Sequence, residues 1–280
     1  MPGRMRIAAW TVVAALVAAP AGAQLVETNQ AGLRMGHVHL NVTDVDAHKR
    51  FWTAVMGGTI VTHGPLELIQ FPGTYLILQE VEQPAPAPAG SIINHIGFVV
   101  QDMPKMLAAW KAAGLPIEPT ENPNEVYLLA PDGIRVEVYG EPALPTAVAM
   151  NHVHFAPPDV PAIKRWYVRM FGVNPTRRPC VACVSKPRMI ETGDLPGGVN
   201  LSFSPPGNVL VKNPLPTRGR AIDHIGFDVQ DLDATIRRLE AQGVKVEGPV
   251  RQLPGTRVRV ALLTDPWGTS IELTESLTPP

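Results

Sequence analysis

Hydrophobic and polar residues alternate along four short stretches of the chain, and a helical pattern follows each of them. In the fourth stretch Ile225, Phe227 and Val229 fall on one face of a strand, whereas the histidine at position 224 falls on the other. Beyond each stretch, apolar residues recur at the spacing of a helix that packs through one face. The pattern therefore predicts four strand–helix units. Their strands begin the segments 35–45, 93–103, 150–160 and 222–232.

Two of these segments have nearly the same sequence. Residues 93–103 read INHIGFVVQDM and residues 222–232 read IDHIGFDVQDL, so that eight of eleven positions agree. The segments MGHVHLNVTDV and MNHVHFAPPDV, which begin at residues 35 and 150, are weaker copies. An internal repeat of this kind indicates one structural unit that is used four times.

Capping residues predict where the four helices begin and end. An aspartate precedes each helix and can accept hydrogen bonds from its first free amides, and a glycine follows each helix, where a left-handed residue is favoured. The aspartates are Asp44, Asp102, Asp159 and Asp231, and the glycines are Gly57, Gly114, Gly172 and Gly243. Shorter strand patterns complete the units and end in GTYLILQE, GIRVEVYG, GVNLSFSP and GTSIELTE. Each unit, or module, is therefore predicted to be β-α-β-β-β.

Proline-rich breaks group the modules along the chain. The segment QPAPAPAG at 83–90 is predicted to be a stiff linker, and EPALPTAV at 141–148 separates two halves. We expect one domain at 35–142, with modules 35–82 and 91–142, and a second at 149–277, with modules 149–207 and 220–277. Residues 143–148 link the domains, and residues 24–34 lead into the first.

The N-terminus has the features of a secretory signal peptide. Arg4 and Arg6 form a basic region, residues 7–19 an apolar one, and residues 21–23 a small-residue cleavage site. Residues 1–23 are therefore predicted to be removed, which places the mature protein in the periplasm or outside the cell. An uncleaved membrane anchor is the alternative, although the apolar run is short for a membrane span.

The composition is typical of a globular protein and narrows the choice of partners. The 280 residues are 45% hydrophobic and 18% charged, and removal of the two arginines of the signal peptide changes the formal charge from −1 to −3. A mildly acidic chain without a basic stripe argues against nucleic acid and anionic lipid as partners. We expect a small-molecule partner, no membrane association after cleavage, and a monomer or homodimer.

Cys180 and Cys183 are the only cysteines, and they form a C-x-x-C pair in a predicted strand or hairpin. In an exported protein such a pair can be a disulfide, a metal pair or a redox pair. Because no helix start follows it, we favour a structural disulfide or two inert thiols.

Six of the eight histidines lie on the first strands of the modules. Four of them share one register, on the face opposite the helix: His37, His95, His152 and His224. The last strands of modules two and four add Glu137 and Glu272 between apolar neighbours, where a carboxylate is costly unless it is paired or binds a cation. We therefore predict one facial triad of two histidines and one carboxylate in each domain. The triads are His37, His95 and Glu137, then His152, His224 and Glu272.

Four βαβββ modules, with a histidine on the first strand and a glutamate on the last, resemble the vicinal oxygen chelate superfamily, which includes glyoxalases, bleomycin resistance proteins and extradiol dioxygenases. The resemblance extends from about Met35 to Leu277. It implies an α+β fold in which the modules pair into two glyoxalase-like domains, each a curved mixed sheet around a metal cleft. It also implies a divalent metal that chelates two neighbouring oxygens of a substrate.

The resemblance also separates the activities within the family. Glyoxalase I-type enzymes usually have a fourth ligand on the last strand of the first module, where this chain has Ile77 and Ser202. The segment YLLAPDGIRVE, from Tyr127 to Glu137, is similar to the signature of extradiol dioxygenases, whereas LLTDPWGTSIE has leucine in place of the tyrosine. The histidine expected before that tyrosine is absent from both halves. The resemblance therefore implies a catalytic role for Tyr127 and favours the N-terminal site.

The remaining histidines complete the assignment. His39 and His154 lie two residues beyond proposed ligands and face the same clefts, about 7 Å further along the strand. We assign them as general bases or substrate hydrogen-bonding groups, with metal ligation as the alternative. His48 and His63 are assigned to a helix surface and a loop, without function.

The sequence thus predicts an exported metalloenzyme for a small substrate with vicinal oxygens, similar to extradiol dioxygenases. Fe²⁺ is the favoured metal, and Mn²⁺, Zn²⁺, Ni²⁺ and Co²⁺ are alternatives. A lyase or isomerase similar to lactoylglutathione lyase is the second activity. A non-catalytic protein that binds small molecules is the alternative outside the enzymes.

Overall fold

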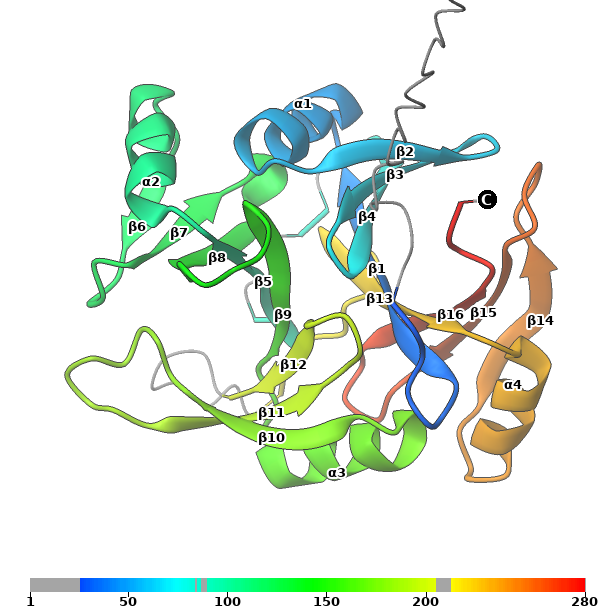
Figure 1. Cartoon of the computed structure of the whole chain (residues 1–280). Helices are drawn as coiled ribbons and strands as arrows, with labels where there is room; N and C mark the ends of the chain where they lie inside the picture. The colour runs from blue at the N-terminus through cyan, green and yellow to red at the C-terminus, as the bar shows by residue number, and fades with distance from the viewer. Residues whose placement is uncertain (1–25, 84, 87–89, 205–212, 280) are drawn as a thin grey trace, which may run out of the picture.

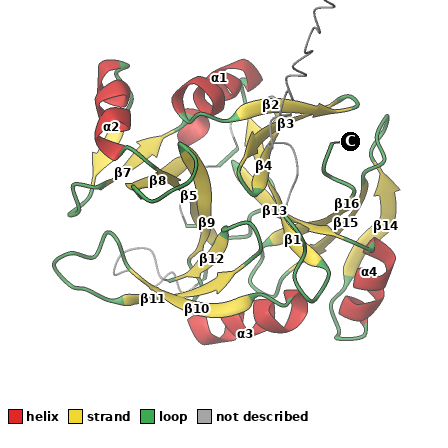
Figure 2. Ribbon diagram, viewed as in Figure 1, coloured by secondary structure: helices red, strands yellow, loops and turns green. Residues whose placement is uncertain are grey.

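Among the residues that the structure describes, the strands form two eight-stranded mixed sheets, and four helices pack against them (Figures 1 and 2). The computed structural model describes residues 26–83, 85–86, 90–204 and 213–279. The predicted signal peptide, residues 1–23, lies outside the described residues. Within the described ranges, no helix combines the length and the apolar character that crossing a membrane would require.

Each module has the predicted order of elements. Module one contains β1 (Leu33–Val42), α1 (Val45–Arg50), a π-helical continuation η1 (Phe51–Val55), β2 (Thr59–His63), β3 (Leu66–Phe71) and β4 (Thr74–Glu80). Module two contains β5 (Ile93–Val100), α2 (Met103–Ala112), β6 (Ile117–Pro119), β7 (Glu125–Leu129), the 3-10 turn η2 (Pro131–Gly133) and β8 (Arg135–Gly140). Module three contains β9 (Val148–Phe155), α3 (Val160–Phe171), β10 (Asn174–Pro179), β11 (Met189–Asp194) and β12 (Asn200–Phe203). Module four contains β13 (Ile222–Val229), α4 (Leu232–Glu240), β14 (Val246–Gln252), β15 (Arg259–Thr264) and β16 (Ser270–Glu275).

The predicted capping of the helices is confirmed. Each of the four aspartates precedes its helix, and its side chain accepts a hydrogen bond from a backbone amide of the first turn. Each of the four glycines has a positive φ, between 63° and 84°. These local interactions end the helices where the sequence predicts, since only a residue that tolerates left-handed backbone fits there.

The partners of the modules differ from the prediction. β1 pairs with β13, so modules one and four share one sheet, and β5 pairs with β9, so modules two and three share the other. We call these the 1/4 sheet and the 2/3 sheet. The expected pairing of consecutive modules, within 35–142 and within 149–277, is therefore wrong for the sheets.

The linkers give a physical reason for this exchange. The connection between β8 and β9 is short and leaves modules two and three in one sheet. The segment 83–90 contains three prolines, and its sequence is typical of a semi-rigid spacer, which favours the placement of module one away from module two.

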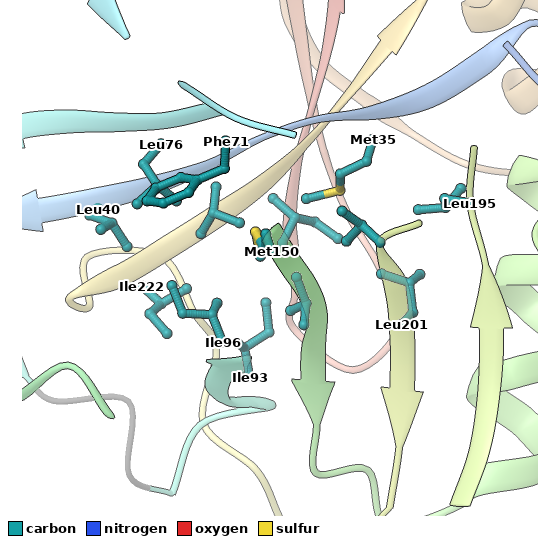
Figure 3. Packing of buried hydrophobic residues seen from close by; sticks show 14 of the residues in the cluster. Met35, Leu40, Phe71, Leu76, Ile93, Ile96, Met150, Leu195, Leu201 and Ile222 are labelled. Carbon is teal, nitrogen blue, oxygen red and sulfur yellow. The ribbon is translucent and has the colours of Figure 1, made fainter. Parts of the chain in front are cut away.

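One apolar core joins the two sheets. Residues from both pack together in Figure 3, among them Met35 and Leu76 from the 1/4 sheet and Ile96 and Met150 from the 2/3 sheet. Helices also cross between sheets, since the ring of Phe171 on α3 lies 4.7 Å from that of Phe227 on β13 (centroid to centroid). The sheets therefore form a single body with a shared interior.

The assignment of His48 to a helix surface is wrong. Its side chain is fully buried, and its Nε2 lies 3.1 Å from Oδ2 of Asp132 in module two. The indole of Trp52 donates to its Nδ1, so that Nε2 carries the hydrogen that is shared with Asp132. His63 is buried too, at the end of β2. Both histidines belong to contacts between segments that are distant in sequence, which helical periodicity does not reveal.

The exchange of modules predicts how fragments of the chain behave. A fragment that ends at Pro145 contains β1 without its antiparallel partner β13 and β5 without its antiparallel partner β9, so we expect it to be unfolded or aggregated on its own. Mixing it with a fragment that covers residues 149–280 should restore the circular dichroism spectrum and one cooperative unfolding transition. If the N-terminal fragment alone unfolds cooperatively as a monomer, the exchanged pairing is contradicted.

Candidate metal centre

Four of the predicted site residues lie together at a cavity formed by modules two and three, which we call the 2/3 cleft. His95 lies on β5, Glu137 on β8, and His152 and His154 on β9, and one ligand atom from each lies within 4.8 Å of the others. Gly97 of β5 stands opposite Glu137 on one side and His152 on the other. A Cβ atom at position 97 would lie 2.0 Å from Cε1 of His152. The glycine of the repeated His-Ile-Gly phrase therefore leaves the space that the imidazole occupies.

Hydrogen bonds to neighbouring residues orient two of the imidazoles. Nδ1 of His95 lies 2.8 Å from Oδ1 of Asn94, and Nδ1 of His152 lies 2.9 Å from Oδ1 of Asn151. Because an amide oxygen only accepts, each Nδ1 carries the hydrogen and each Nε2 offers a lone pair.

These lone pairs converge on the carboxylate of Glu137. Nε2 of His95 lies 2.7 Å from Oε2 of Glu137. Nε2 of His152 lies 3.4 Å from Nε2 of His95 and 3.6 Å from Oε2 of Glu137. Three electron-pair donors in one buried place repel one another unless a cation lies between them. The residues present fit a divalent metal with two imidazole ligands and one carboxylate ligand.

Tyr127 on β7 completes the surroundings of the carboxylate. Its hydroxyl donates to Oε2 of Glu137 at 3.0 Å, and the guanidinium of Arg135 lies 3.6 Å from the centre of its ring. Burial and the nearby charge of Glu137 raise the pKa of Tyr127, so the phenol keeps its proton. Burial raises the pKa of Glu137, but interactions with His152 and His95, when these rings carry a second proton in the metal-free site, more than offset this and hold the pKa well below its usual range.

His154 is held by the end of β12. Its Nε2 lies 3.2 Å from the carbonyl oxygen of Ser204 and 3.0 Å from the hydroxyl of the same residue. Since a carbonyl only accepts, Nε2 carries the hydrogen and Nδ1 keeps a lone pair. Burial and the neighbouring histidines lower the pKa of His154 well below its usual value, so the ring is neutral at pH 7.

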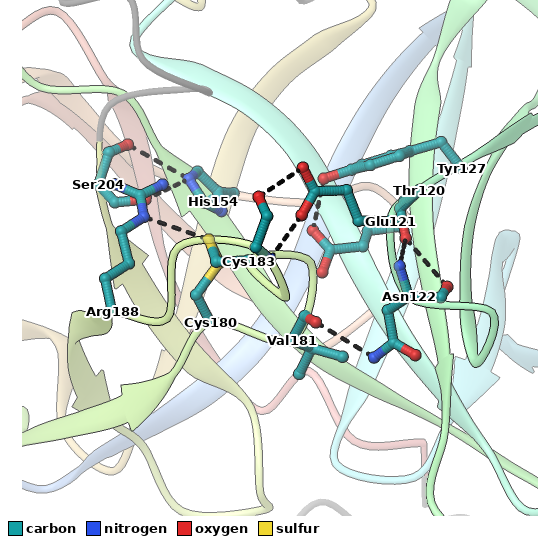
Figure 4. The surroundings of a disulfide bond; sticks show 12 residues. Thr120, Glu121, Asn122, Tyr127, His154, Cys180, Val181, Cys183, Arg188 and Ser204 are labelled. Atoms are coloured by element: carbon teal, nitrogen blue, oxygen red, sulfur yellow. Dashed lines mark hydrogen bonds between the residues drawn. A yellow bond between two sulfur atoms is a disulfide. The ribbon is translucent and has the colours of Figure 1, made fainter.

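A cavity of about 760 Å³ opens onto this cluster and is lined by residues of modules two and three. The loop between β10 and β11 forms part of the rim of this cavity. Cys180 and Cys183 in this loop are joined in a disulfide, so the first of the two favoured states of the cysteine pair is confirmed. The amide of Asn122 donates to the carbonyl of Val181 at 3.1 Å (Figure 4). Two further hydrogen bonds join Ser185 to Glu121. The disulfide-bonded loop is therefore tied to module two across the cleft, and we call residues 180–188 the rim loop.

The face of the 1/4 sheet that corresponds to the 2/3 cleft carries a second cluster, and because of this correspondence alone we call it the 1/4 cleft. Ligand atoms of His37, His39 and His224 lie within 4.8 Å of one another. Gly226 stands between His37 and Glu272 as Gly97 does in the other cleft, and a Cβ there would lie 2.1 Å from the ring of His37. The two clefts are thus built on the same plan.

The hydrogen bonding of this second cluster is less complete. Nδ1 of His224 lies 2.6 Å from Oδ1 of Asp223, but neither its Nε2 nor either ring nitrogen of His37 has a hydrogen-bond partner among the described residues. Nε2 of His37 lies 3.5 Å from Oε1 of Glu272, in a geometry that makes no hydrogen bond. Burial raises the pKa of Glu272.

Apolar side chains occupy the face of the 1/4 sheet beside this cluster. Ile77 on β4 is the register partner of His39, whereas the corresponding partner of His154 is Ser202, which lines the 2/3 cavity. The amide of Leu277, just beyond β16, donates to Oδ1 of Asp228 at 3.1 Å. The apolar cluster consists of Leu68, Tyr75, Ile77, Val258, Val260 and Leu277.

The predicted triads are therefore regrouped. His95 and Glu137 share a cleft with His152 and not with His37, and His224 and Glu272 share one with His37 and not with His152. The error has one cause, the assumption that consecutive modules share a sheet. All six predicted ligands, together with His39 and His154, still line one cleft or the other.

Sequence reasoning missed the residues that orient the site. Asn94, Asn151 and Asp223 immediately precede three of the histidines, so the repeated phrases already contained this signal. Glu125 lies two residues before Tyr127 on the same face of β7, and burial together with Glu137 raises its pKa to about 8. The contribution of Ser204 had no local signal, because it depends on where β12 ends.

Buried histidines predict how stability depends on pH. Burial lowers the pKa of His37, and it lowers that of His39 to about 3. Because these groups titrate near pH 6.5 when unfolded, the folded state binds fewer protons and loses stability as the pH falls below that value. We expect the free energy of unfolding of the metal-free protein to fall by about 1.4 kcal/mol per group and pH unit. Urea unfolding at a series of pH values measures it, and the His39→Gln variant should show a smaller slope. If the free energy of unfolding of the wild-type and His39→Gln proteins depended equally on pH, the lowered pKa of His39 would be contradicted.

A family model matches most of the chain. The family is described as the glyoxalase/bleomycin resistance protein/dioxygenase superfamily, and its model matches residues 34–138 and 149–273. Each match spans two consecutive modules, so the repeat in the sequence follows the halves of the chain although the sheets exchange modules between them. A comparison with curated proteins gave no match.

Solved structures share the architecture. Glyoxalase I from Zea mays matches with a TM-score of 0.67 at 16% identity, over 87% of this chain and 92% of that chain. A protein from Bacillus subtilis subsp. subtilis str. 168 with a provisional dioxygenase name matches with a TM-score of 0.62 at 15% identity, over 91% of this chain and 86% of that chain. At these identities the likeness shows the fold alone, and it confirms the predicted α+β fold with two glyoxalase-like domains.

Proposed function

Because the chain belongs to the glyoxalase/bleomycin resistance protein/dioxygenase superfamily, we propose that it is a metal-dependent enzyme for a small substrate with two neighbouring oxygens, of the extradiol dioxygenase type. One observation carries this proposal. The lone pairs of two oriented imidazoles converge with the carboxylate of Glu137 in a buried site at the base of a large cavity.

The working site is assigned to the 2/3 cleft. His95, His152 and Glu137 would hold the metal, and Fe²⁺ is the favoured ion, since two histidines and one carboxylate are typical of non-haem iron oxygenases. A bound divalent ion would supply Lewis acidity toward the two oxygens of the substrate. Asn94 and Asn151 keep the imidazoles in the tautomer that a ligand requires.

Two side chains are placed to handle protons and orientation. Nδ1 of His154 has a lone pair, because its Nε2 donates to Ser204, so it can accept the proton of a substrate hydroxyl. The phenol of Tyr127 keeps its proton and donates it in a hydrogen bond to the carboxylate ligand, so it orients Glu137. Rotation of the O–H would let it donate to a substrate oxygen in place of Glu137.

A lyase or isomerase of the glyoxalase type is the second candidate. The free Nδ1 of His154 favours it, since a neutral base beside the metal ligands could move a proton between two carbons of a hydroxyketone. Such an enzyme would convert its substrate without oxygen uptake, which separates the two candidates.

Replacing one glutamate in each cleft tests the assignment of the site. We expect Glu137→Gln to weaken Fe²⁺ binding by about 100-fold or more, because it removes the anionic ligand. Glu272→Gln is the matched control in the other cleft and should leave both metal content and oxygen uptake with catechols unchanged. Metal analysis after anaerobic loading and an oxygen electrode supply the measurements. If the two variants behave alike, or if the wild-type protein binds no transition metal, the proposal fails.

We further propose that the protein is exported and that its mature form begins at Gln24. The basic and apolar regions of residues 1–23 support export, as does the Cys180–Cys183 disulfide, because disulfides persist in oxidising compartments. N-terminal sequencing of the protein from the periplasmic or extracellular fraction should read Gln-Leu-Val-Glu. A full-length N-terminus in the cytoplasmic fraction would contradict it.

A further inference from the structure

The wall of the 2/3 cavity carries positive charge that its own carboxylates do not fully neutralise. Two of the four basic side chains on the wall are paired, Arg135 with Glu118 at 3.0 Å and Arg178 with Asp194 at 2.6 Å. Lys186 lies close enough to Glu121 to contribute to the lowering of the pKa of that carboxyl group, after the hydrogen bonds from Ser185. The four basic residues are Arg135, Arg178, Lys186 and Arg188.

Arg188 is the one that has no carboxylate partner. All aspartates and glutamates of the chain fall within the described residues, and none of them forms an ion pair with it. Its Nε donates to Sγ of Cys183 at 3.2 Å, and its two terminal amino groups have no partner in the part of the chain that the structure describes. A sulfur atom is a weak acceptor, so the charge of the guanidinium is not balanced there.

The position of Arg188 makes this charge relevant to a ligand. It ends the rim loop, just before β11, and Figure 4 shows its side chain extending toward Ser204 and His154. All three residues line the same cavity. The disulfide shapes the loop from which Arg188 projects, and the contact with Cys183 orients its guanidinium.

We propose that Arg188 binds an anionic group, of the carboxylate type, on the substrate of the 2/3 cleft. This inference rests on the proposed function, because it assumes that the vicinal oxygens of the same molecule meet the His95, His152 and Glu137 site. The two free amino groups of a guanidinium form a planar fork that matches the two oxygens of a carboxylate. A cavity of about 760 Å³ has room for a ring at the metal site and a charged substituent near the rim.

The test compares two ligands that differ only in charge. Dihydroxyphenylacetate with adjacent hydroxyl groups carries a carboxylate, and its methyl ester has the same shape without the charge. We expect the anaerobic Fe²⁺-loaded enzyme to bind the acid about tenfold or more tightly than the ester, since hydrogen bonds to charged groups are the stronger kind. Titration followed by the absorbance of the bound ligand gives both dissociation constants.

Two arginine variants make the test specific. Arg188→Gln should bind acid and ester within about twofold of one another while its affinity for the ester stays that of the wild type. Arg177→Gln is the matched control, because Arg177 lies on neighbouring β10, is exposed, pairs with Glu191 and does not line the cavity. It should keep the full preference for the acid.

The outcomes separate this inference from the proposed function. If the wild-type enzyme binds both ligands equally, or if Arg188→Gln retains the preference, the anionic anchor is wrong and the metal site stands. If the loaded enzyme binds neither ligand, the proposed function fails and the inference fails with it. A preference for the acid that disappears only in Arg188→Gln supports the assignment.

Discussion

The antiparallel pairing of β5 with β9 is the interaction on which the candidate site depends. It joins two strands that belong to different halves of the chain and sets Gly97 opposite His152. Parallel pairing of β5 with β8 sets the same glycine opposite Glu137. A slip of β9 by one residue would turn His152 and His154 to the other face of the sheet, because side chains alternate along a strand. The absence of a side chain at position 97 is equally necessary, since any Cβ there would occupy the place of the imidazole.

The two clefts show how the same backbone plan supports different electrostatics. In the 2/3 cleft the carboxylate contacts histidines and a phenol, and its pKa is held low despite burial. In the 1/4 cleft Glu272 has neither a tyrosine nor a close imidazole hydrogen bond, and burial raises its pKa. The side chain beside the histidine cluster is also more polar in the 2/3 cleft, where it is Ser202, than in the 1/4 cleft, where it is Ile77. Polar surroundings favour a charged ligand, and apolar surroundings disfavour it.

Local features of this chain could be predicted from its sequence, and the choice of strand partners could not. Helix ends depend on residues within a few positions of one another, such as Asp231 and Gly243, so capping chemistry is enough to locate them. The face of the strand on which the histidines lie follows from the alternation of side chains along the strand alone. Partner choice is different, because the first strands of the four modules are so similar that any of them could pair with any other. The observed pairing is the one in which both sheets share a core, and contacts between residues so distant in sequence leave no periodic signal. The burial of His48 against Asp132 escaped prediction for the same reason.

The covalent joining of the four modules has an evolutionary consequence. Two identical two-module chains could build the same pair of sheets as a symmetric dimer, but every substitution would then appear in both clefts at once. In the single chain each cleft is encoded separately. Tyr127 could therefore be present where module four has Leu262, and Asn94 where it has Asp223, without any change on the other side. A single chain can therefore combine packing residues such as Leu277 on one side with a cavity on the other. The differences between the two sides of the molecule are of the kind that separate encoding permits.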